Sequence, residues 1–129
     1  MRIIIAGAGA VGRHLAKLLS REDMDISLID ERQDRLGDLD ANYDLLTKVG
    51  SPTSINDLKN IGVEDVDLFI AVTPSESENI TACLLANELG AKKTLARIDH
   101  YEYLVPENKR IFEKKGLNHL IYPELLAAK

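Results

Sequence analysis

The segment Arg2–Leu19 reads RIIIAGAGAVGRHLAKLL and decides the class of fold. Four apolar residues are followed by glycines at positions 7, 9 and 12, and then by an amphipathic stretch. A strand, a Gly-x-Gly-x-x-Gly turn and a helix in this order form the phosphate-binding turn of dinucleotide-binding Rossmann folds. In such a turn Gly7 permits the tight bend, Gly9 lets a pyrophosphate approach the backbone, and Gly12 allows the helix to pack closely on the strand.

The alternation of strand and helix continues through the chain. Short apolar runs occur at Arg2–Ala6, Asp25–Asp30, Leu45–Val49, Asp67–Thr73, Lys93–Ile98 and Asn118–Tyr122. Helical patterns follow the glycine turn and occupy Glu31–Leu39, Ser54–Asn60, Glu76–Leu89, Glu107–Lys115 and a last piece from Pro123. Strands that alternate with helices at this spacing pair in parallel through right-handed crossovers. We therefore predict one α/β domain over residues 1–129, a Rossmann-like doubly wound six-stranded parallel sheet of order 3-2-1-4-5-6.

The spacing of apolar residues within the helical segments predicts which side chains face the core. The expected inward residues are Val11, Leu15, Leu18, Leu19, Leu36, Leu39, Ile55, Leu58, Ile80, Leu84, Leu85, Leu89, Ile111 and Phe112. Gly90 is expected to end the long fourth helix, and Cys83 within that helix is interpreted as a small core residue.

Composition limits the classes of function. The chain has 129 residues, 45% of them hydrophobic, and a net charge of −5. An acidic chain does not favour nucleic-acid binding, which usually needs a basic face. The single cysteine cannot form an intramolecular disulfide, which is typical of a reducing compartment. No apolar run reaches the roughly 18 residues of a membrane span, so we expect a cytoplasmic protein without direct membrane insertion.

An acidic residue stands where a nucleotide ribose would lie. Asp30 ends the second predicted strand, 18 residues after Gly12, and is expected to accept hydrogen bonds from the adenosine ribose hydroxyls. Its charge would repel a 2′-phosphate and so favours NAD over NADP. Two alternatives stay open: Asp30 could only cap the helix that follows, and Arg32 could accommodate a 2′-phosphate or be a solvated charge.

The loops after the third and fourth strands are expected near the same ligand, because ligands bind outside the carboxyl ends of parallel strands. This makes Gly50, Ser51, Val72 and Thr73 candidates, although these residue types also occur in ordinary turns. Arg97 lies inside the apolar stretch TLARI, where an unpaired charge is costly. It is interpreted as reaching either a phosphate or an acidic side chain in a structural salt bridge.

No combination of nucleophile, base and orienting group is visible in the sequence, so no catalytic residue is predicted. The three histidines and the cysteine lack the spacing of a metal site, so no metal ligand is predicted.

The residues also point to a family. The stretches IIIAGAGAVGRHLAKLLS, DISLID, VGSPTSINDLKNIGVEDVDLFIAVTPSESENITACLLANELGAKKTLARI and YPELLAA resemble the N-terminal lobe of RCK (KTN) domains, and among them the TrkA potassium-uptake regulators. The resemblance covers essentially the whole chain. It implies nucleotide contacts by Gly7, Gly9, Ala10, Val11, Gly12, Asp30, Glu31, Arg32, Gly50, Ser51, Thr73, Asn79 and Arg97.

The resemblance further implies partners and location. Family members sit on the cytoplasmic face of the membrane, bind NAD(H) or adenine nucleotides, and gate a potassium transporter or channel subunit. They form homodimers or larger rings through their last helices, for which IYPELLAAK supplies the segment here. Complete relatives carry a smaller C-terminal lobe, so we expect this chain to be a fragment or a solitary lobe.

Two departures from the family pattern bear on the ligand. Ser51 replaces an acidic residue that many relatives place near the adenine amino group, and Ala10 and Val11 occupy positions where ATP-binding members often carry an arginine. The first departure weakens the expected contact with the adenine amino group, and the second favours NAD(H), with ATP or ADP second. The leading hypothesis is a regulatory, non-enzymatic NAD(H)-binding domain that gates a potassium transporter or channel. The alternative is the cofactor-binding half of an NAD-dependent dehydrogenase that lacks its substrate domain.

Overall fold

The computed structural model describes residues 1–122. The helix predicted from Pro123, and the greater part of the segment IYPELLAAK expected to form a dimer, lie outside the described residues. The strands are β1 (Arg2–Ala6), β2 (Asp25–Asp30), β3 (Leu45–Val49), β4 (Leu68–Ala71), β5 (Lys93–Arg97) and β6 (His119–Ile121). The α-helices are α1 (Ala10–Leu19), α2 (Gln33–Leu36), α3 (Leu39–Asn42), α4 (Ile55–Asn60), α5 (Glu76–Glu88) and α6 (Pro106–Glu113). Short 3₁₀ turns, η1 (Val63–Asp65) and η2 (Tyr101–Leu104), precede β4 and α6.

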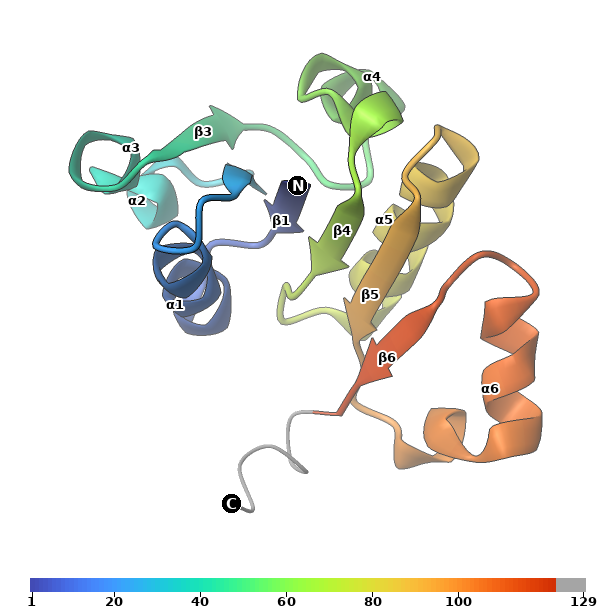
Figure 1. Ribbon diagram of the computed structural model, residues 1–129. Helices are drawn as coiled ribbons and strands as arrows, with labels where there is room; N and C mark the ends of the chain where they lie inside the picture. The colour runs from blue at the N-terminus through green and yellow to red at the C-terminus, as the bar shows by residue number, and fades with distance from the viewer. Residues whose placement is uncertain (123–129) are drawn as a thin grey trace.

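The six strands form one parallel sheet of order β3-β2-β1-β4-β5-β6, which confirms the predicted topology (Figure 1). From β1 the sheet grows toward β2 and β3 on one side, and from β4 it grows toward β5 and β6 on the other, so the order of strands reverses between β1 and β4. These two strands pair directly, with Ala6 opposite Ala71 at their carboxyl ends. Loops that leave β1 and β4 therefore diverge and open a crevice there, which is where doubly wound sheets bind ligands.

Two hydrophobic cores cover the two faces of the sheet. On one face Phe69 and Leu58 are fully buried, together with Cys83 of α5, and on the other Leu28 packs with Ala16 of α1 and Leu36 of α2. Burial raises the pKa of the Cys83 thiol to about 12, so this cysteine stays protonated at neutral pH. The interpretation of Cys83 as a core residue is confirmed.

The predicted apolar stripe of the first helix is wrong at two positions. Gly12 and Ala16 are the buried residues of α1, whereas Val11 and Leu18 are 49% and 44% exposed. Small side chains bring the helix axis close to the sheet, so the contact follows Gly12 and Ala16 while Leu15 packs at its margin.

The predicted helix Glu31–Leu39 is broken into two. Gly37 adopts a positive φ of 49° and ends α2, and the chain restarts as α3 after Asp38. Leu36 and Leu39 nevertheless both face the core, as expected. The break lets one turn of each helix present a single leucine to the sheet.

Other helix predictions hold in part. Ile55 and Ile111 were expected to be inward but are exposed, because Leu58 and Phe112 fill the core-facing positions of these short helices. In α5 the most buried residues are Asn79, Ala82, Cys83 and Ala86, with Ile80, Leu85 and Leu89 packed at the margin. Gly90 ends this helix with a φ of 119°, as predicted.

Replacing Phe69 by alanine should remove the largest fully buried side chain and destabilise the fold by about 3–5 kcal/mol. Leu46, which is 65% exposed on β3, is the matched control, and Leu46→Ala should change stability by less than about 0.5 kcal/mol. Urea denaturation followed by circular dichroism measures both. Equal effects of the two substitutions would contradict the core described above.

Candidate nucleotide-binding site

The glycine turn is built as the sequence predicts. Gly7 has a φ of 110°, and a Cβ there would lie 2.9 Å from the backbone nitrogen of Thr73. A Cβ on Gly12 would clash with the carbonyl oxygen of Gly7. The missing Cβ therefore allows α1 to pack closely against the glycine turn rather than against the strand. A Cβ on Gly9 would meet nothing within 4 Å and would instead fill the open space in front of the helix. Gly9 thus marks the place where a ligand can touch the backbone.

The first turn of α1 keeps free hydrogen-bond donors. Gly9 is the N-cap residue and supplies no side chain to the first-turn N–H groups, among them those of Ala10 and Val11. Val11 is half exposed at this end of the helix. Uncapped N–H groups at the positive end of a helix dipole are suited to bind a phosphate.

Asp30 ties the glycine turn to the neighbouring strand. It is only 4% exposed, and its Oδ2 accepts a hydrogen bond of 2.8 Å from the backbone N–H of Ala8. Its Oδ1 accepts one of 2.8 Å from the N–H of Arg32. Arg32 is the N-cap residue of α2 and no side chain among the described residues caps this helix, so the helix-capping role left open above for Asp30 is not found. A carboxylate has about four acceptor positions. Two of them therefore stay available for ribose hydroxyls.

A pocket of about 200 Å³ opens beside Asp30. Its lining residues come from the turn after β2, the loop after β3 and the start of α5, and they are Asp30, Glu31, Arg32, Arg35, Pro52, Thr73 and Glu78. Four of the predicted site residues, Asp30, Glu31, Arg32 and Thr73, are brought together here. The other three lining residues, Arg35, Pro52 and Glu78, were not predicted from the sequence. For Glu78 a signal was available, because the Ser-x-x-Glu spacing of Ser75 and Glu78 is typical of a helix N-terminus.

Arg32 is not a free cation. Its Nη2 lies 2.8 Å from Oδ2 of Asp34, and its Nε donates to Oδ1 of the same carboxylate at 3.1 Å. The hydrogen bond and the charge of Asp34 raise the pKa of Arg32. The guanidinium is therefore engaged within its own turn.

Asn79 joins the loop after β4 to the end of β5. It is 1% exposed, and its Oδ1 accepts hydrogen bonds from the N–H of Thr73 at 2.8 Å and from the Thr73 hydroxyl at 2.7 Å. Its Nδ2 donates to the carbonyl of Thr73 at 2.9 Å and to that of Arg97 at 3.0 Å. Since both ends of the amide are used, Asn79 positions Thr73 and Arg97 rather than facing the open pocket.

Arg97 has an unusual environment. Its Nε is shielded from solvent, and no hydrogen-bond partner for it occurs among the described residues. Within residues 1–122 no carboxylate pairs with this guanidinium, so the structural salt bridge considered above is not found there. A buried donor without a partner costs about 1–3 kcal/mol, which an anionic ligand would offset.

The remaining predicted residues have mainly structural contacts. The N–H of Gly50 donates to the carbonyl of Asp30 at 2.9 Å, and the N–H of Ser51 donates to Oδ2 of Asp57 at 2.9 Å. Val72 is buried beneath the glycine turn, where its Cγ2 would touch a Cβ on Gly12. These three residues shape the loops around the site, and none of them lines the pocket beside Asp30.

An unpredicted contact fixes the start of α5. Glu76 accepts hydrogen bonds from the N–H groups of Asp99 and His100, and its Oε1 lies 2.6 Å from Nδ1 of His100. Burial alone would raise the pKa of Glu76, but these hydrogen bonds outweigh it and lower the pKa. No spacing pattern along the chain indicates this pair, since 24 residues separate its members.

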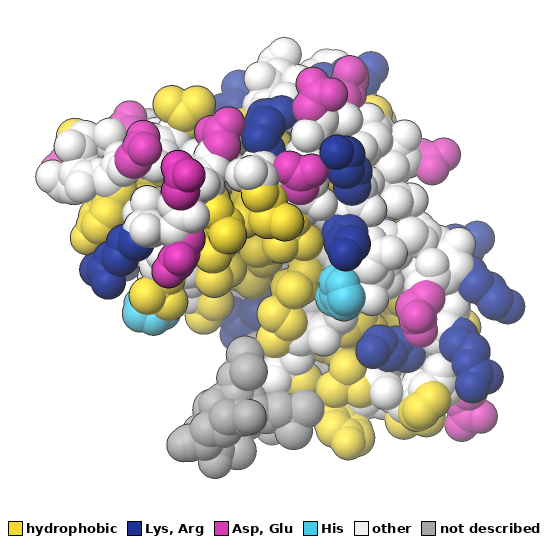
Figure 2. Space-filling model, in the orientation of Figure 1, with side chains coloured by type: hydrophobic (Ala, Val, Ile, Leu, Met, Phe, Trp, Pro, Cys, Tyr) yellow, Lys and Arg dark blue, Asp and Glu magenta, His cyan; other side chains and the backbone are white. Residues whose placement is uncertain are grey.

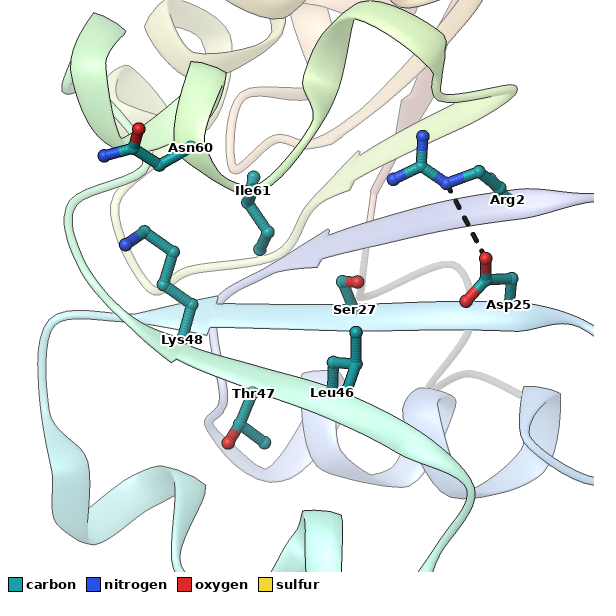
Figure 3. Close-up of a pocket in the computed structure, with 8 residues that line it drawn as sticks. All are labelled: Arg2, Asp25, Ser27, Leu46, Thr47, Lys48, Asn60 and Ile61. Atoms are coloured by element: carbon teal, nitrogen blue, oxygen red, sulfur yellow. Dashed lines mark ion pairs between the residues drawn. The ribbon is translucent and has the colours of Figure 1, made fainter.

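A larger pocket lies elsewhere and lacks this chemistry. Its volume is about 330 Å³, and it is formed by β1, β2, β3 and the end of α4, with Leu46, Ser27 and Ile61 facing it (Figure 3). Arg2 and Asp25, which start β1 and β2, pair across its rim at 3.7 Å. This larger pocket contains none of the predicted site residues, whereas the smaller pocket contains Asp30, Glu31, Arg32 and Thr73, so size alone does not identify the candidate site.

Residues 1–122 contain neither a candidate metal site nor a candidate membrane span. No group of three or more histidine, cysteine, aspartate or glutamate side chains within residues 1–122 is arranged to hold a metal ion. No helix in this range is long and apolar enough to cross a bilayer.

Gly9→Ala and Gly12→Ala should separate binding from folding. The Gly12 substitution places a methyl group on the Gly7 carbonyl and should destabilise the fold by roughly 1–3 kcal/mol or more. The Gly9 substitution meets no protein atom and should cost only about 0.5 kcal/mol, yet it should weaken the binding of a nucleotide whose phosphates contact this helix N-terminus. Denaturation measures stability, and calorimetric titration with nucleotides measures binding. Nucleotide binding by Gly9→Ala as tight as that of the wild type would contradict a phosphate site at Gly9.

Asn79→Ala should destabilise the fold by about 2–4 kcal/mol, because it leaves the N–H of Thr73 and the carbonyl of Arg97 without their buried partner. Asn56, exposed on α4, is the matched control, and Asn56→Ala should stay within about 0.5 kcal/mol of the wild type. Thermal unfolding of both variants measures the difference. A similar midpoint for the two would show that the amide does not hold the loop.

Comparisons with known proteins agree with this geometry. The family model of the TrkA-N domain matches residues 3–123. The chain is 42% identical over 129 residues to the Trk system potassium uptake protein TrkA of Haemophilus influenzae, covering 98% of this chain but only 28% of that protein. The chain thus spans less than a third of the length of that relative.

Two solved structures share the fold. The TrkA-N domain of the inner membrane protein ybaL from Escherichia coli superimposes with a TM-score of 0.82 at 17% identity, covering 98% of this chain and 90% of that one. The GsuK channel bound to NAD gives a TM-score of 0.75 at 19% identity, covering 93% of this chain and 21% of that one. At such identities the likeness shows the fold alone. From the family model and the sequence identity, we conclude that the chain belongs to the TrkA-N domain family.

Proposed function

We propose that this chain is a nucleotide-binding regulatory domain of a potassium uptake system, and that NAD(H) is its ligand. Residues 1–129 act as one nucleotide-binding domain in this proposal. The observation that carries it is the combination of an uncapped α1 N-terminus at Gly9 with the buried carboxylate of Asp30. A dinucleotide needs both, the first for its pyrophosphate and the second for its adenosine ribose.

The unpartnered Nε of Arg97 supports the same ligand. Arg97 ends β5, and Asn79 fixes its backbone to the loop after β4. Among the described residues, no acidic side chain pairs with Arg97 and none caps the N-terminus of α1. A phosphate group of the ligand would provide a negatively charged partner for both. The residues present therefore fit a dinucleotide, with Gly9 and the first turn of α1 holding phosphate and Asp30 holding ribose.

The relatives give the proposal its biological setting. The Haemophilus influenzae relative is a potassium uptake protein, and GsuK is a channel whose structure was solved with NAD. We infer that nucleotide binding shifts a homodimer or larger ring between two arrangements and so gates a membrane potassium transporter or channel. A ligand can do this only by its difference in affinity for the two arrangements. The domain would then act without catalysis at the inner face of the membrane.

The ligand is tested by thermal unfolding with NADH, NAD, ATP and ADP. A ligand present at about one hundred times its dissociation constant should add roughly 2.7 kcal/mol of stability. In a domain of this size that corresponds to a rise in midpoint of about 10 °C. The Asp30→Asn variant should lose most of the rise with NADH. If none of the four nucleotides moves the midpoint of the wild type, the proposed function is wrong.

Gating is tested in the longer relative. The corresponding domain of the Haemophilus influenzae protein is replaced by this chain, with or without Gly9→Ala, and potassium uptake is followed in cells that depend on the hybrid. Uptake that responds to the cellular NADH level with the wild-type chain, and not with Gly9→Ala, supports regulation through the bound nucleotide. Equal uptake with both chains would contradict it.

A further inference from the structure

The pocket beside Asp30 is lined from separate parts of the chain. The turn after β2 contributes Asp30, Glu31, Arg32 and Arg35, the loops after β3 and β4 contribute Pro52 and Thr73, and the start of α5 contributes Glu78. Figure 2 shows acidic side chains concentrated on the upper left of the molecule, with basic side chains down the centre and on the right, where α6 lies. The charge of the pocket is set by the ion pairs of its own lining residues.

Both arginines of the pocket are already neutralised. Arg32 pairs with Asp34 at 2.8 Å, and Nη1 of Arg35 lies 3.6 Å from Oδ2 of Asp30. Glu31 and Glu78 take part in no ion pair among residues 1–122. The uncompensated charge of the pocket is therefore that of two carboxylates.

The carboxylate of Glu78 does not cap the N-terminus of α5. In a capping box its carboxylate would accept the backbone N–H of Ser75. That N–H donates instead to the hydroxyl of Thr73 at 3.2 Å, while the Ser75 hydroxyl caps the helix by accepting the N–H of Glu78. The side chain of Glu78 thus lines the pocket, although its backbone belongs to the cap.

We propose that Glu78 is a specificity-determining residue, which makes the pocket reject an adenosine ribose that carries a 2′-phosphate and accept one with free hydroxyls. The inference rests on the proposed function, because it places the adenosine ribose of NAD(H) in this pocket. Asp30 would bind the ribose hydroxyls from the β2 side. Glu78 would add a second negative charge from α5, in the same pocket as the carboxylate of Asp30.

The electrostatics of Glu78 agree with this role. Burial raises the pKa of its carboxyl, and the charges of Glu31 and Asp30 raise it further, while Arg35 acts in the opposite direction. The carboxylate of Glu78 therefore already lies in a negative electrostatic potential. A phosphate in the pocket would add two more charges to it, and like charges at short range repel strongly when they are partly shielded from water.

Calorimetric titration with NADH and NADPH tests the inference on the whole chain. The wild type should bind NADH more tightly than NADPH. Glu78→Gln should lower the ratio of the NADPH to the NADH dissociation constant, the selectivity gap, about tenfold. The change should come mainly from tighter NADPH binding, because the substitution removes one charge and keeps the size of the side chain. NADH affinity should change less than about twofold.

Three further variants make the result specific. Glu88→Gln removes a charge from the exposed far end of α5, and Glu78→Asp keeps the charge, so both should retain the wild-type gap. Glu78→Ala is a second neutral substitution and decides the question if Glu78→Gln does not fold. An unchanged gap in the folded neutral variant, with NADH still bound, would overturn the inference and leave the proposed function intact. Absence of NADH binding by the wild type would overturn the proposed function itself.

Discussion

The hydrogen bond from the Ala8 N–H to the Asp30 carboxylate is the contact on which the candidate site depends. It is 2.8 Å long and buried, and it joins the turn after β1 to the last residue of β2. The neighbouring N–H of Gly7 donates to the carbonyl of Ile29 at 2.9 Å, so the whole turn is held to one strand. A buried carboxylate is stable only when its acceptor positions are used. Asp30 meets this condition by accepting from the N–H groups of Ala8 and Arg32 and by pairing with Arg35, and so holds the glycine turn in place.

The second half of the site is held in the same manner from the other side of the crevice. Asn79 is as buried as Asp30 and uses its amide to fix the loop after β4 against the end of β5. The two halves meet where a Cβ on Gly7 would touch the backbone of Thr73. The direct pairing of β1 with β4 places them there, because it brings the carboxyl ends of both strands to one point. The pocket of about 200 Å³ beside Asp30 lies next to this contact, since Thr73 lines it.

Sequence reasoning was most successful where local rules and tertiary packing agree. The order of the six strands, the bends at Gly7 and Gly90 and the burial of Cys83 follow from periodicity and from residue types with few alternatives. It failed where packing chose between residues of similar character. Val11 has the spacing of a buried residue, yet Gly12 lies against the turn and leaves Val11 in the solvent. The single helix predicted over Glu31–Leu39 likewise ignored Gly37, whose positive φ ends α2.

The sequence by itself determined the parallel α/β fold, the glycine turn and the acidic residue at the end of β2, because each depends on spacing along one continuous segment. Only the tertiary structure decided what these residues do together. It paired Arg32 with Asp34, joined Asn79 by hydrogen bonds to Thr73 and Arg97, and brought Glu78 to the same pocket as Asp30. Those relations join residues from the turn after β2, the loop after β4 and the end of β5. Chain order does not encode such distances, because the packing of the sheet and its helices sets them.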